Sequence, residues 1–360
     1  MTIWRWANLI DSVPESARVS LGEGNTPLIR SRRIGPAAGL DQLYFKLEYG
    51  NPTGSYKDRF AAAAISHMLA TDRGNCIATS SGNTGSSLAA YCTAAGITCR
   101  IAIVDGAPLG KLKQMLAYGA GIARIRDFGI DAEITTQVFR QLKHIGRRPG
   151  WSLEVSAFVF SPVGMSGVQT ISYELAEQSD GAIDHVFCPA GGGGLCVAVA
   201  RGFRKLVERG ELKACPAVHC VQPEGNNTIS GPLNEGLDRA RAVPCTTSVS
   251  GLQVASVVDG DLTIQECRAT RGAGHLVTDQ DVWNMQKRLA REEGVFSEPA
   301  GAVALTAALQ AAENGLISKT DRIVCLVTGS GFKDDSAVER LNSDTVCGVI
   351  TSSELDTWAQ

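Results

Sequence analysis

Short apolar segments alternate with longer Ala-rich segments along the chain, beginning at residue 43. By their length and composition we expect strands at 43–47, 75–79, 100–104, 122–126, 151–155, 184–189, 219–222 and 322–327. We expect helices at 55–71, 80–95, 110–118, 132–144 and 195–207, and a further Ala-rich helix that starts within 295–301. Strands and helices that alternate at this spacing predict an α/β fold, with a parallel sheet covered by helices on both faces.

The stretch 49–60 interrupts this pattern between the first predicted strand and the first predicted helix. Pro52 and Gly54 are typical of a tight turn. Ser55 is a candidate N-cap, and Asp58 three residues later completes a capping-box pattern. We therefore expect the helix to begin at Ser55.

Lys57 lies in the first turn of that predicted helix. The partial positive charge of a helix N-terminus disfavours an ammonium group, so we expect the pKa of Lys57 to be lowered. A neutral lysine amine can attack a carbonyl carbon. The alternative is a solvated lysine with no chemical role.

Two other loops between a predicted strand and a predicted helix have the composition of anion-binding sites. Residues 80–85, Ser-Ser-Gly-Asn-Thr-Gly, combine short side chains with backbone N–H groups that can approach a carboxylate closely. Residues 190–195, Ala-Gly-Gly-Gly-Gly-Leu, leave room for an oxyanion against the N-terminus of the next helix. The alternative for the first loop is an ordinary helix cap with a glycine turn.

Charge and apolar content exclude several classes of function. The 360 residues include 34 basic and 37 acidic side chains, with a net charge of −3 and no basic stripe for nucleic acid or an anionic membrane. The N-terminus lacks the apolar core of a signal peptide, and no apolar run approaches the ~20 residues that a membrane span needs. We therefore expect a cytoplasmic enzyme that acts on a small molecule.

The 11 cysteines include no C-x-x-C pair, and most of them fall in apolar predicted strands or helices. Their number is odd, and the ligand spacing of zinc sites is missing. We therefore expect buried free thiols, with no disulfide and no metal site.

Two motifs give the chain a resemblance to a known family. Residues 51–59, Asn-Pro-Thr-Gly-Ser-Tyr-Lys-Asp-Arg, preceded by residues 21–28, Leu-Gly-Glu-Gly-Asn-Thr-Pro-Leu, resemble the threonine synthases. These belong to the fold-type II pyridoxal-phosphate (PLP) enzymes, together with tryptophan synthase β and the serine/threonine dehydratases. The likeness covers nearly the whole chain, and it implies two α/β domains with mostly parallel twisted sheets and PLP in the cleft between them.

The resemblance also implies a domain division and an assembly. Residues 1–79 and 171–360 would form a large, discontinuous PLP-binding domain, and residues 80–170 a small mobile domain. The family further implies a homodimer.

In the family, PLP forms a Schiff base with the lysine that matches Lys57, which also acts as the catalytic base. The resemblance implies cofactor contacts from Lys57, Asn83, Gly191, Gly192, Gly193, Gly194, Leu195 and Thr328, and a substrate-carboxylate loop of Ser80, Ser81, Gly82, Asn83 and Thr84. Asn83 would bond to the ring hydroxyl of the cofactor. Glu298 either faces the cofactor or caps the helix that follows it.

The residue that matches Thr328, at the start of the motif Thr-Gly-Ser-Gly-Phe-Lys-Asp, places its hydroxyl against the pyridine nitrogen in this family. A hydroxyl cannot keep that nitrogen protonated as a carboxylate would, so the ring is a weaker electron sink. A weaker sink suits removal of a proton followed promptly by loss of a leaving group.

Two places depart from the threonine synthase pattern. The Arg and the Asn that bind the substrate phosphate in that family fall on Gly164 and Phe158 here, and Gly192 and Leu195 stand where Asn is common. An Arg–phosphate contact is worth roughly 1.5–3 kcal/mol, so its loss should affect substrate binding.

Lys111, Lys113 and Thr84 are candidate substitutes for the missing phosphate contact. The sequence thus predicts a lyase that resembles threonine synthase and eliminates or replaces a group at Cβ or Cγ of an amino acid, with O-phosphohomoserine among the candidate substrates. The alternative is a serine/threonine dehydratase-like ammonia-lyase, or a β-replacement enzyme, that acts on an unphosphorylated amino acid. A more distant alternative is a PLP-binding protein without catalytic activity.

Overall fold

The computed structural model describes residues 1–80, 82–105, 109–254, 256–345 and 347–359, although the side chains of residues 109–111 are not among the described ones. The strands are β1 Leu28–Arg30, β2 Leu43–Leu47, β3 Asn75–Ala78, β4 Thr98–Val104, β5 Gly121–Ile125, β6 Trp151–Glu154, β7 His185–Pro189, β8 Ala217–Pro223, β9 Gly274–Val277 and β10 Ile323–Val327. The helices are α1 Ile34–Ala37, α2 Lys57–Ala70, α3 Asn83–Ala94, α4 Leu109–Ala117, α5 Ala132–Gly146, α6 Pro162–Val168, α7 Thr170–Gln178, α8 Gly194–Glu208, α9 Ser230–Asn234, α10 Gly260–Ala269, α11 Asp279–Glu293, α12 Pro299–Glu313, α13 Asp335–Leu341 and α14 Leu355–Trp358.

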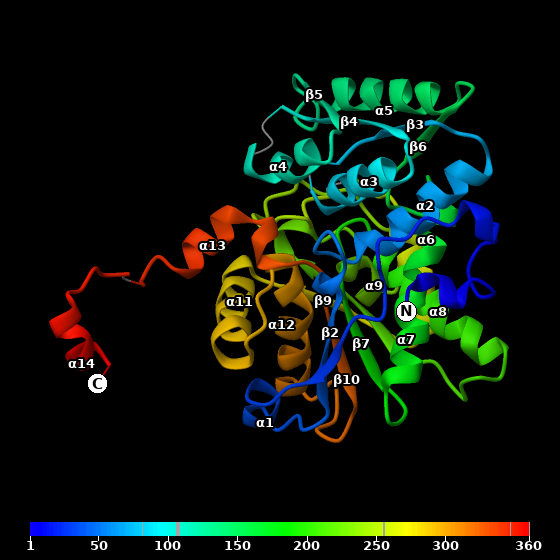
Figure 1. The fold of residues 1–360 in the computed structure, drawn as a ribbon. Helices are drawn as coiled ribbons and strands as arrows, with labels where there is room; N and C mark the ends of the chain where they lie inside the picture. The colour runs from blue at the N-terminus through cyan, green and yellow to red at the C-terminus, as the bar shows by residue number, and fades with distance from the viewer. Residues whose placement is uncertain (81, 106–108, 255, 346, 360) are drawn as a thin grey trace.

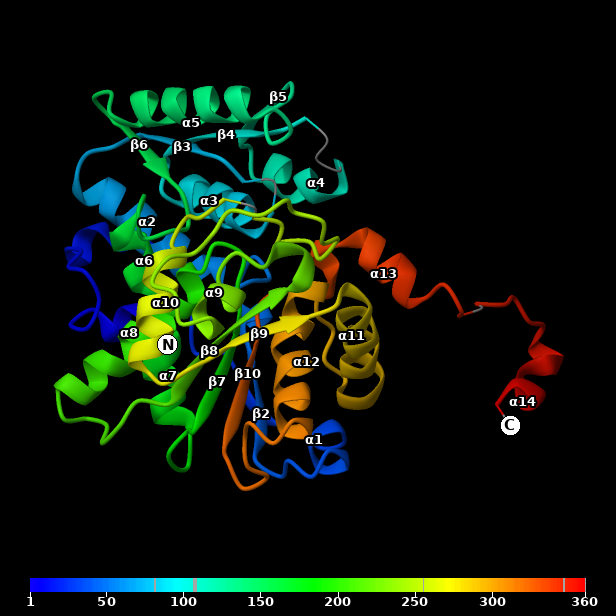
Figure 2. The same ribbon diagram turned by 180° about the vertical axis from the view of Figure 1, so that it is seen from behind.

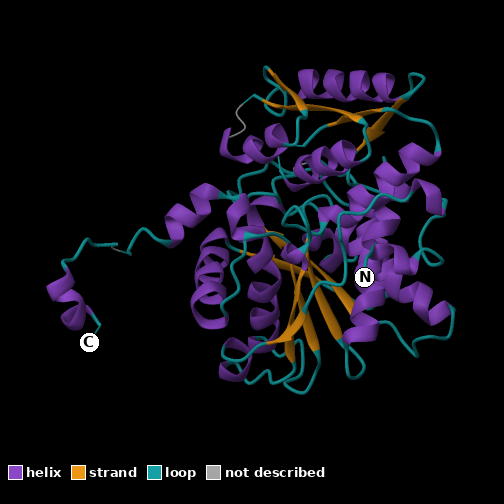
Figure 3. Ribbon diagram, in the orientation of Figure 1, coloured by secondary structure: helices purple, strands orange, loops and turns teal. Residues whose placement is uncertain are grey.

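These strands form two separate sheets (Figure 3). The larger sheet has the order β1-β2-β10-β7-β8-β9, and the smaller sheet has the order β5-β4-β3-β6. All neighbouring strands run parallel except β1 and β2, which are antiparallel. The predicted α/β fold with two mostly parallel sheets is therefore confirmed.

Helices cover both faces of each sheet (Figures 1 and 2). In the larger lobe, which is the six-stranded sheet with its helices, α11 and α12 lie on one face and α7, α8 and α10 on the other. In the smaller lobe, which is the four-stranded sheet with α3, α4 and α5, α5 lies on the outer face and α3 and α4 on the face toward the larger lobe. Helix α2 packs against both α3 and α6, and so joins the two lobes.

The contact between α2 and α6 depends on glycine. A Cβ atom on Gly164 would lie 2.6 Å from the ring of Phe60, and one on Gly167 would lie 2.3 Å from the backbone oxygen of Arg59. Larger residues would force the two helices apart. This close approach is complemented by Ala61 to Ala64, whose small side chains are all buried in α2.

Most of the predicted strands and helices agree with the structure to within a few residues. The pattern missed the strands β1 and β9 and the helices α1, α6, α7, α9, α10, α11, α13 and α14. Strand β9 is only four residues long, and α11 is largely polar. The buried residues of α11, Val282, Met285, Gln286 and Leu289, nevertheless recur at helical spacing, which is the signal that could have identified this helix.

The predicted capping box at the start of α2 is wrong. The helix begins at Lys57, and its N-cap residue Tyr56 makes no side-chain capping bond. The carboxylate of Asp58 instead accepts hydrogen bonds from the backbone N–H and the hydroxyl of Thr53, both at 2.6 Å. Asp58 therefore stabilises the turn that precedes the helix.

The predicted domain division at residues 80 and 170 stays a prediction. Strand β3 pairs with β4 and with β6, so the smaller sheet already begins at residue 75.

The end of the chain lies apart from both lobes. Residues 347–359 extend away from the body of the molecule and end in the short helix α14 (Figures 1 and 2). Within the described part of the chain, no helix is both long and apolar enough to cross a membrane.

A buried network of charges holds the start of α2. The guanidinium of Arg59 donates to both carboxylate oxygens of Glu48 at 2.8 Å, and to those of Glu174 at 2.7 and 2.8 Å. Lys46 binds the same Glu174 at 2.7 Å, and the side chains of all four residues are at most 1% exposed. Burial alone would raise the pKa of Glu174, but Arg59 and Lys46 lower it to about 2. Glu174 therefore remains charged at neutral pH.

Replacing Arg59 with Met should lower the free energy of unfolding by about 3–5 kcal/mol, because it leaves buried carboxylates without their partner. Urea unfolding at neutral pH, followed by circular dichroism, measures this change. The matched control is Arg209→Ala, which removes the partner of Glu211 in a solvent-exposed pair and should cost about 0–1 kcal/mol. Equal losses in the two variants would contradict a structural role for the network.

Candidate active site

A cavity of about 440 Å³ lies between the two lobes. It is lined by residues that directly follow β3, β6, β7 and β10, so it opens at the carboxyl ends of strands from both sheets. Ligands of α/β proteins bind at this edge of the sheet. The loops that the sequence singled out therefore converge on one cavity.

Nearly all of the predicted site residues line this cavity. They are Lys57, Ser80, Gly82, Asn83, Thr84, Gly191, Gly192, Gly193, Gly194, Leu195 and Thr328. Ser81 lies outside the described residues.

The amine of Lys57 faces the interior of the cavity. Its Nζ atom donates a hydrogen bond to Ser156 Oγ at 2.8 Å and lies 4.4 Å from the centre of the Tyr56 ring. Burial lowers the pKa of Lys57 to about 8, while the carboxylates of Asp259 and Glu298 act in the opposite direction. The predicted direction of the shift is thus reproduced, with burial as its main cause. Ser156 was not predicted as a site residue.

Backbone hydrogen bonds join the turn before Lys57 to the loop after β10. The N–H of Tyr56 donates to the carbonyl oxygen of Thr328 at 3.1 Å, and the N–H of Ser330 donates to that of Gly54 at 2.9 Å. Thr328 itself is only 4% exposed. The lysine and the threonine hydroxyl are therefore located relative to each other by the backbone.

The glycine loop after β7 leaves space that side chains would fill. Gly193 has a φ of +91°, and a Cβ atom on it would lie 2.0 Å from Thr263 Oγ1. Helix α8 begins at Gly194 without a side-chain capping bond, so no side chain satisfies its first N–H groups. A phosphate at a helix N-terminus would satisfy them, and the loop therefore fits the phosphate group of PLP.

Asn83 and Glu298 meet across the cavity. Asn83 Nδ2 donates to Glu298 Oε1 at 2.8 Å, which joins the start of α3 to the start of α12. Glu298 occupies the N-cap position of α12 but makes no side-chain capping bond there. Of the two alternatives for Glu298, the structure therefore favours the one in which it faces the cavity.

The two residues at the positions of the family's phosphate-binding pair do not line the cavity. Gly164 faces Phe60 on α2. The ring of Phe158 lies 4.8 Å below the guanidinium of Arg201, and its backbone N–H donates to Asp259 at 2.7 Å. At the position of the Arg, Gly164 packs against α2, and at the position of the Asn, the ring of Phe158 is covered by Arg201.

Lys333 is a cavity residue that the sequence interpretation missed. Its Nζ atom donates to the backbone oxygen of Thr53 at 2.9 Å and to Gln114 Oε1 at 2.5 Å. Burial lowers the pKa of Lys333, against the effect of nearby carboxylates. Among the described lining residues, Lys57 and Lys333 are the only Lys or Arg side chains. Of the proposed substitutes, Lys113 is exposed and the side chain of Lys111 lies outside the described residues.

Comparisons with known proteins identify the family to which the chain belongs. The sequence profile of a family described as "Pyridoxal-phosphate dependent enzyme" matches residues 19–329. The chain is 31% identical to the threonine synthase of Methanocaldococcus jannaschii over 96% of this chain and 84% of that protein. It is also 31% identical to the threonine synthase of Synechocystis over 98% and 90%, respectively.

Solved structures show the same fold at lower sequence identity. A processed threonine deaminase isoform 2 from Solanum lycopersicum aligns with a TM-score of 0.75 and 21% identity over 95% of this chain and 88% of that one. Maize serine racemase aligns with a TM-score of 0.71 and 24% identity over 94% of each chain.

In the protein freed of PLP, the rate at which Lys57 binds added PLP should rise with pH around a midpoint near 8, because only the neutral amine attacks an aldehyde. Growth of visible absorbance across a pH series measures this rate. Asp259→Asn should lower the midpoint, since the Asp259 carboxylate raises the pKa of Lys57. Lys57→Ala is the control and should show no covalent attachment. A midpoint near the ordinary lysine value of about 10.4 would contradict the effect of burial.

Proposed function

The chain belongs to the pyridoxal-phosphate dependent enzymes, as a lyase of the threonine synthase type, and we propose that it eliminates or replaces a side-chain group on an amino acid that carries no phosphate. The observation that carries this proposal is the packing of Gly164, which turns the position of the family's phosphate-binding arginine toward α2. A guanidinium there would have to displace Phe60.

Different cavity residues would carry out different parts of such a reaction. PLP, when bound, supplies a carbonyl carbon for the amines of Lys57 and of the substrate, together with an electron sink. Gly191 to Gly194 and the N-terminus of α8 would hold its phosphate. Asn83 and Thr328 would orient its ring.

In this proposal, the loop that opens α3 holds the substrate. Ser80, Gly82, Asn83 and Thr84 offer hydroxyls, an amide and backbone N–H groups to the substrate carboxylate. This would leave the Cα–H bond directed at Lys57, with the side chain of the substrate extending into the rest of the cavity.

Lys57 carries the proton transfer in this proposal. With a pKa of about 8 it keeps a useful fraction of neutral amine near neutral pH, so its Nζ atom can take the proton from the substrate Cα. Ser156 Oγ accepts a hydrogen bond from the same Nζ atom and would hold it in place. The group at Cβ is then lost, and the unsaturated amino acid that remains either is hydrolysed to a keto acid and ammonia or takes up another nucleophile at Cβ.

Lys333 supports a second candidate function, which is a threonine synthase that acts on O-phosphohomoserine. Its ammonium group lines the cavity and is bonded to the neutral oxygens of Thr53 and Gln114. A phosphate at the end of a substrate side chain could replace one of these acceptors. Lys333 would then bind the substrate phosphate in place of the arginine that is absent at position 164.

The homodimer that the family resemblance implies stays a prediction, as does the cytoplasmic location expected from the sequence.

Assays of serine, threonine, O-acetylserine and O-phosphohomoserine side by side distinguish the two candidates. We expect a keto acid from one of the unphosphorylated amino acids and no phosphate from O-phosphohomoserine. Lys333→Met should then change the rate little. Joint release of phosphate and threonine would overturn the first candidate.

In that case Lys333→Met should raise KM for O-phosphohomoserine roughly tenfold to hundredfold, because a hydrogen bond to a charged group is worth about 1.5–3 kcal/mol. The matched control is Lys113→Met on the exposed face of α4, which should leave KM unchanged.

A further inference from the structure

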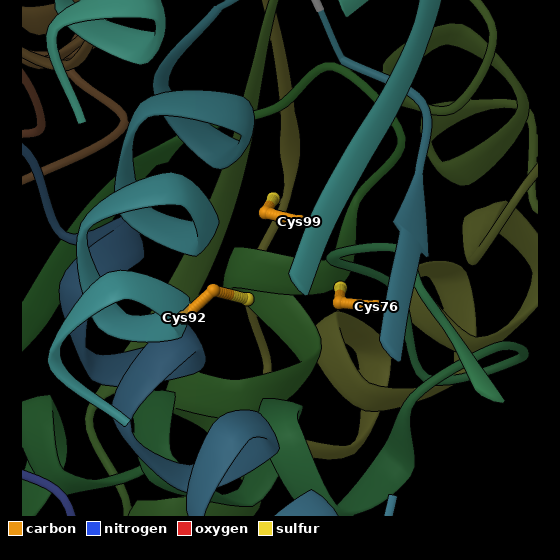
Figure 4. A group of neighbouring side chains, drawn as sticks. All are labelled: Cys76, Cys92 and Cys99. Carbon is orange, nitrogen blue, oxygen red and sulfur yellow. The ribbon is translucent and has the colours of Figure 1, made fainter. Parts of the chain in front are cut away.

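Three cysteines from one βαβ unit meet in the core of the smaller lobe (Figure 4). Cys76 lies on β3, Cys92 on α3 and Cys99 on β4, and the two strand residues are direct partners in the register of the sheet. All three Sγ atoms lie within 4.8 Å of one another. The residues are 0%, 0% and 7% exposed. Among the described residues, this is the one group of three His, Cys or acidic side chains with ligand atoms this close together.

The spacing of the sulfur atoms suits bonds to a single ion. Metal–sulfur bonds of about 2.3 Å in a tetrahedral zinc site place neighbouring sulfurs about 3.8 Å apart. The three sulfurs could reach such an arrangement by small side-chain movements, because they already lie within 4.8 Å of one another on elements that pack together.

The apolar surroundings favour an ion whose complex with three thiolates is uncharged. The three cysteines belong to one apolar cluster with residues such as Leu88, Ala89 and Ile101. A net charge buried among such side chains is costly. Three thiolates around a divalent ion would leave a charge of −1, whereas three thiolates around a trivalent ion leave none.

The three thiols influence one another's acidity. Hydrogen bonds from Cys76 and Cys92 lower the pKa of the Cys99 thiol, and the pKa values of the other two thiols are raised. Each thiol would lose its proton as its own bond to the ion forms.

We propose that Cys76, Cys92 and Cys99 form a binding site for a soft trivalent ion of the arsenite class. Thiolates are the ligands that soft ions prefer. Arsenous acid, As(OH)₃, is small and uncharged. Each of the three S–H groups gives its proton to one hydroxide, three water molecules leave and three As–S bonds form. No electron is transferred, so no oxidant or reductant is needed.

Such a complex would tie α3 to β3 and β4. Because the ion would bind only the folded arrangement, binding should make the smaller lobe more resistant to unfolding. The loop between β3 and α3 contains Ser80 and Gly82, which line the cavity. This inference rests on the cysteine geometry and is independent of the proposed function.

The test uses the PLP-loaded enzyme, reduced with a phosphine that carries no thiol and incubated with sodium arsenite. Mass spectrometry under native conditions should show one arsenic per chain, and the unfolding temperature should rise. X-ray absorption at the arsenic edge should show three sulfur neighbours. Oxygen neighbours, or no bound arsenic, would overturn the proposal.

Two variants assign the ion to these residues. Cys92→Ala should weaken arsenite binding by more than the roughly tenfold to hundredfold that disturbed outer contacts of a metal site cost. The matched control is Cys196→Ala on α8, since Cys196 is also a fully buried helix thiol close to cysteines of two strands. Binding that is lost in the control and retained in Cys92→Ala would overturn the assignment. If Cys92→Ala fails to fold, Cys99→Ser, which changes the size of the side chain little, tests the same assignment and should also weaken binding.

Discussion

The buried guanidinium of Arg59 is the constraint on which the position of Lys57 depends. Arg59 lies two residues after Lys57 and is bonded to Glu48 at the end of β2 and to Glu174 on α7. Its remaining hydrogen bonds reach Thr26 and Thr170. Because an unpaired buried charge costs several kcal/mol, these segments cannot separate without a large loss of stability. Charge pairing therefore locates the start of α2, where no side chain caps the helix.

The same helix also determines which residue fits at position 164. On one side, α2 carries Lys57 into the cavity; on the other, Phe60 and Ala64 pack against α6. The contact is so close that position 164 requires a glycine. A position that could carry a phosphate-binding arginine has thus become part of a helix interface, and Lys333 from the loop after β10 is left as the second cation of the cavity.

Sequence patterns predicted the site better than its surroundings. The loops at 80–84 and 191–195 were identifiable because each follows an apolar strand and opens a helix, and this local order places both loops at the carboxyl edge of a sheet. Lys333 belongs to the motif at 328–334, in which only Thr328 was assigned a role from the sequence. Ser156 had no signal of its own, since a serine after a strand is common. Its role depends on the direction in which Lys57 points.

The sequence by itself determined the α/β class and most of the strands and helices, and it indicated Lys57 and the loops at 80–85 and 190–195 as candidate site residues. These features follow from hydrophobic periodicity and from glycine and hydroxyl residues at strand-to-helix turns, which act over short stretches of chain. The tertiary structure alone decided the partners of Asp58, the direction of Gly164 and the meeting of Cys76, Cys92 and Cys99. Each of these depends on how separate elements pack, because packing determines which side chains become neighbours and which charges or thiols are buried together.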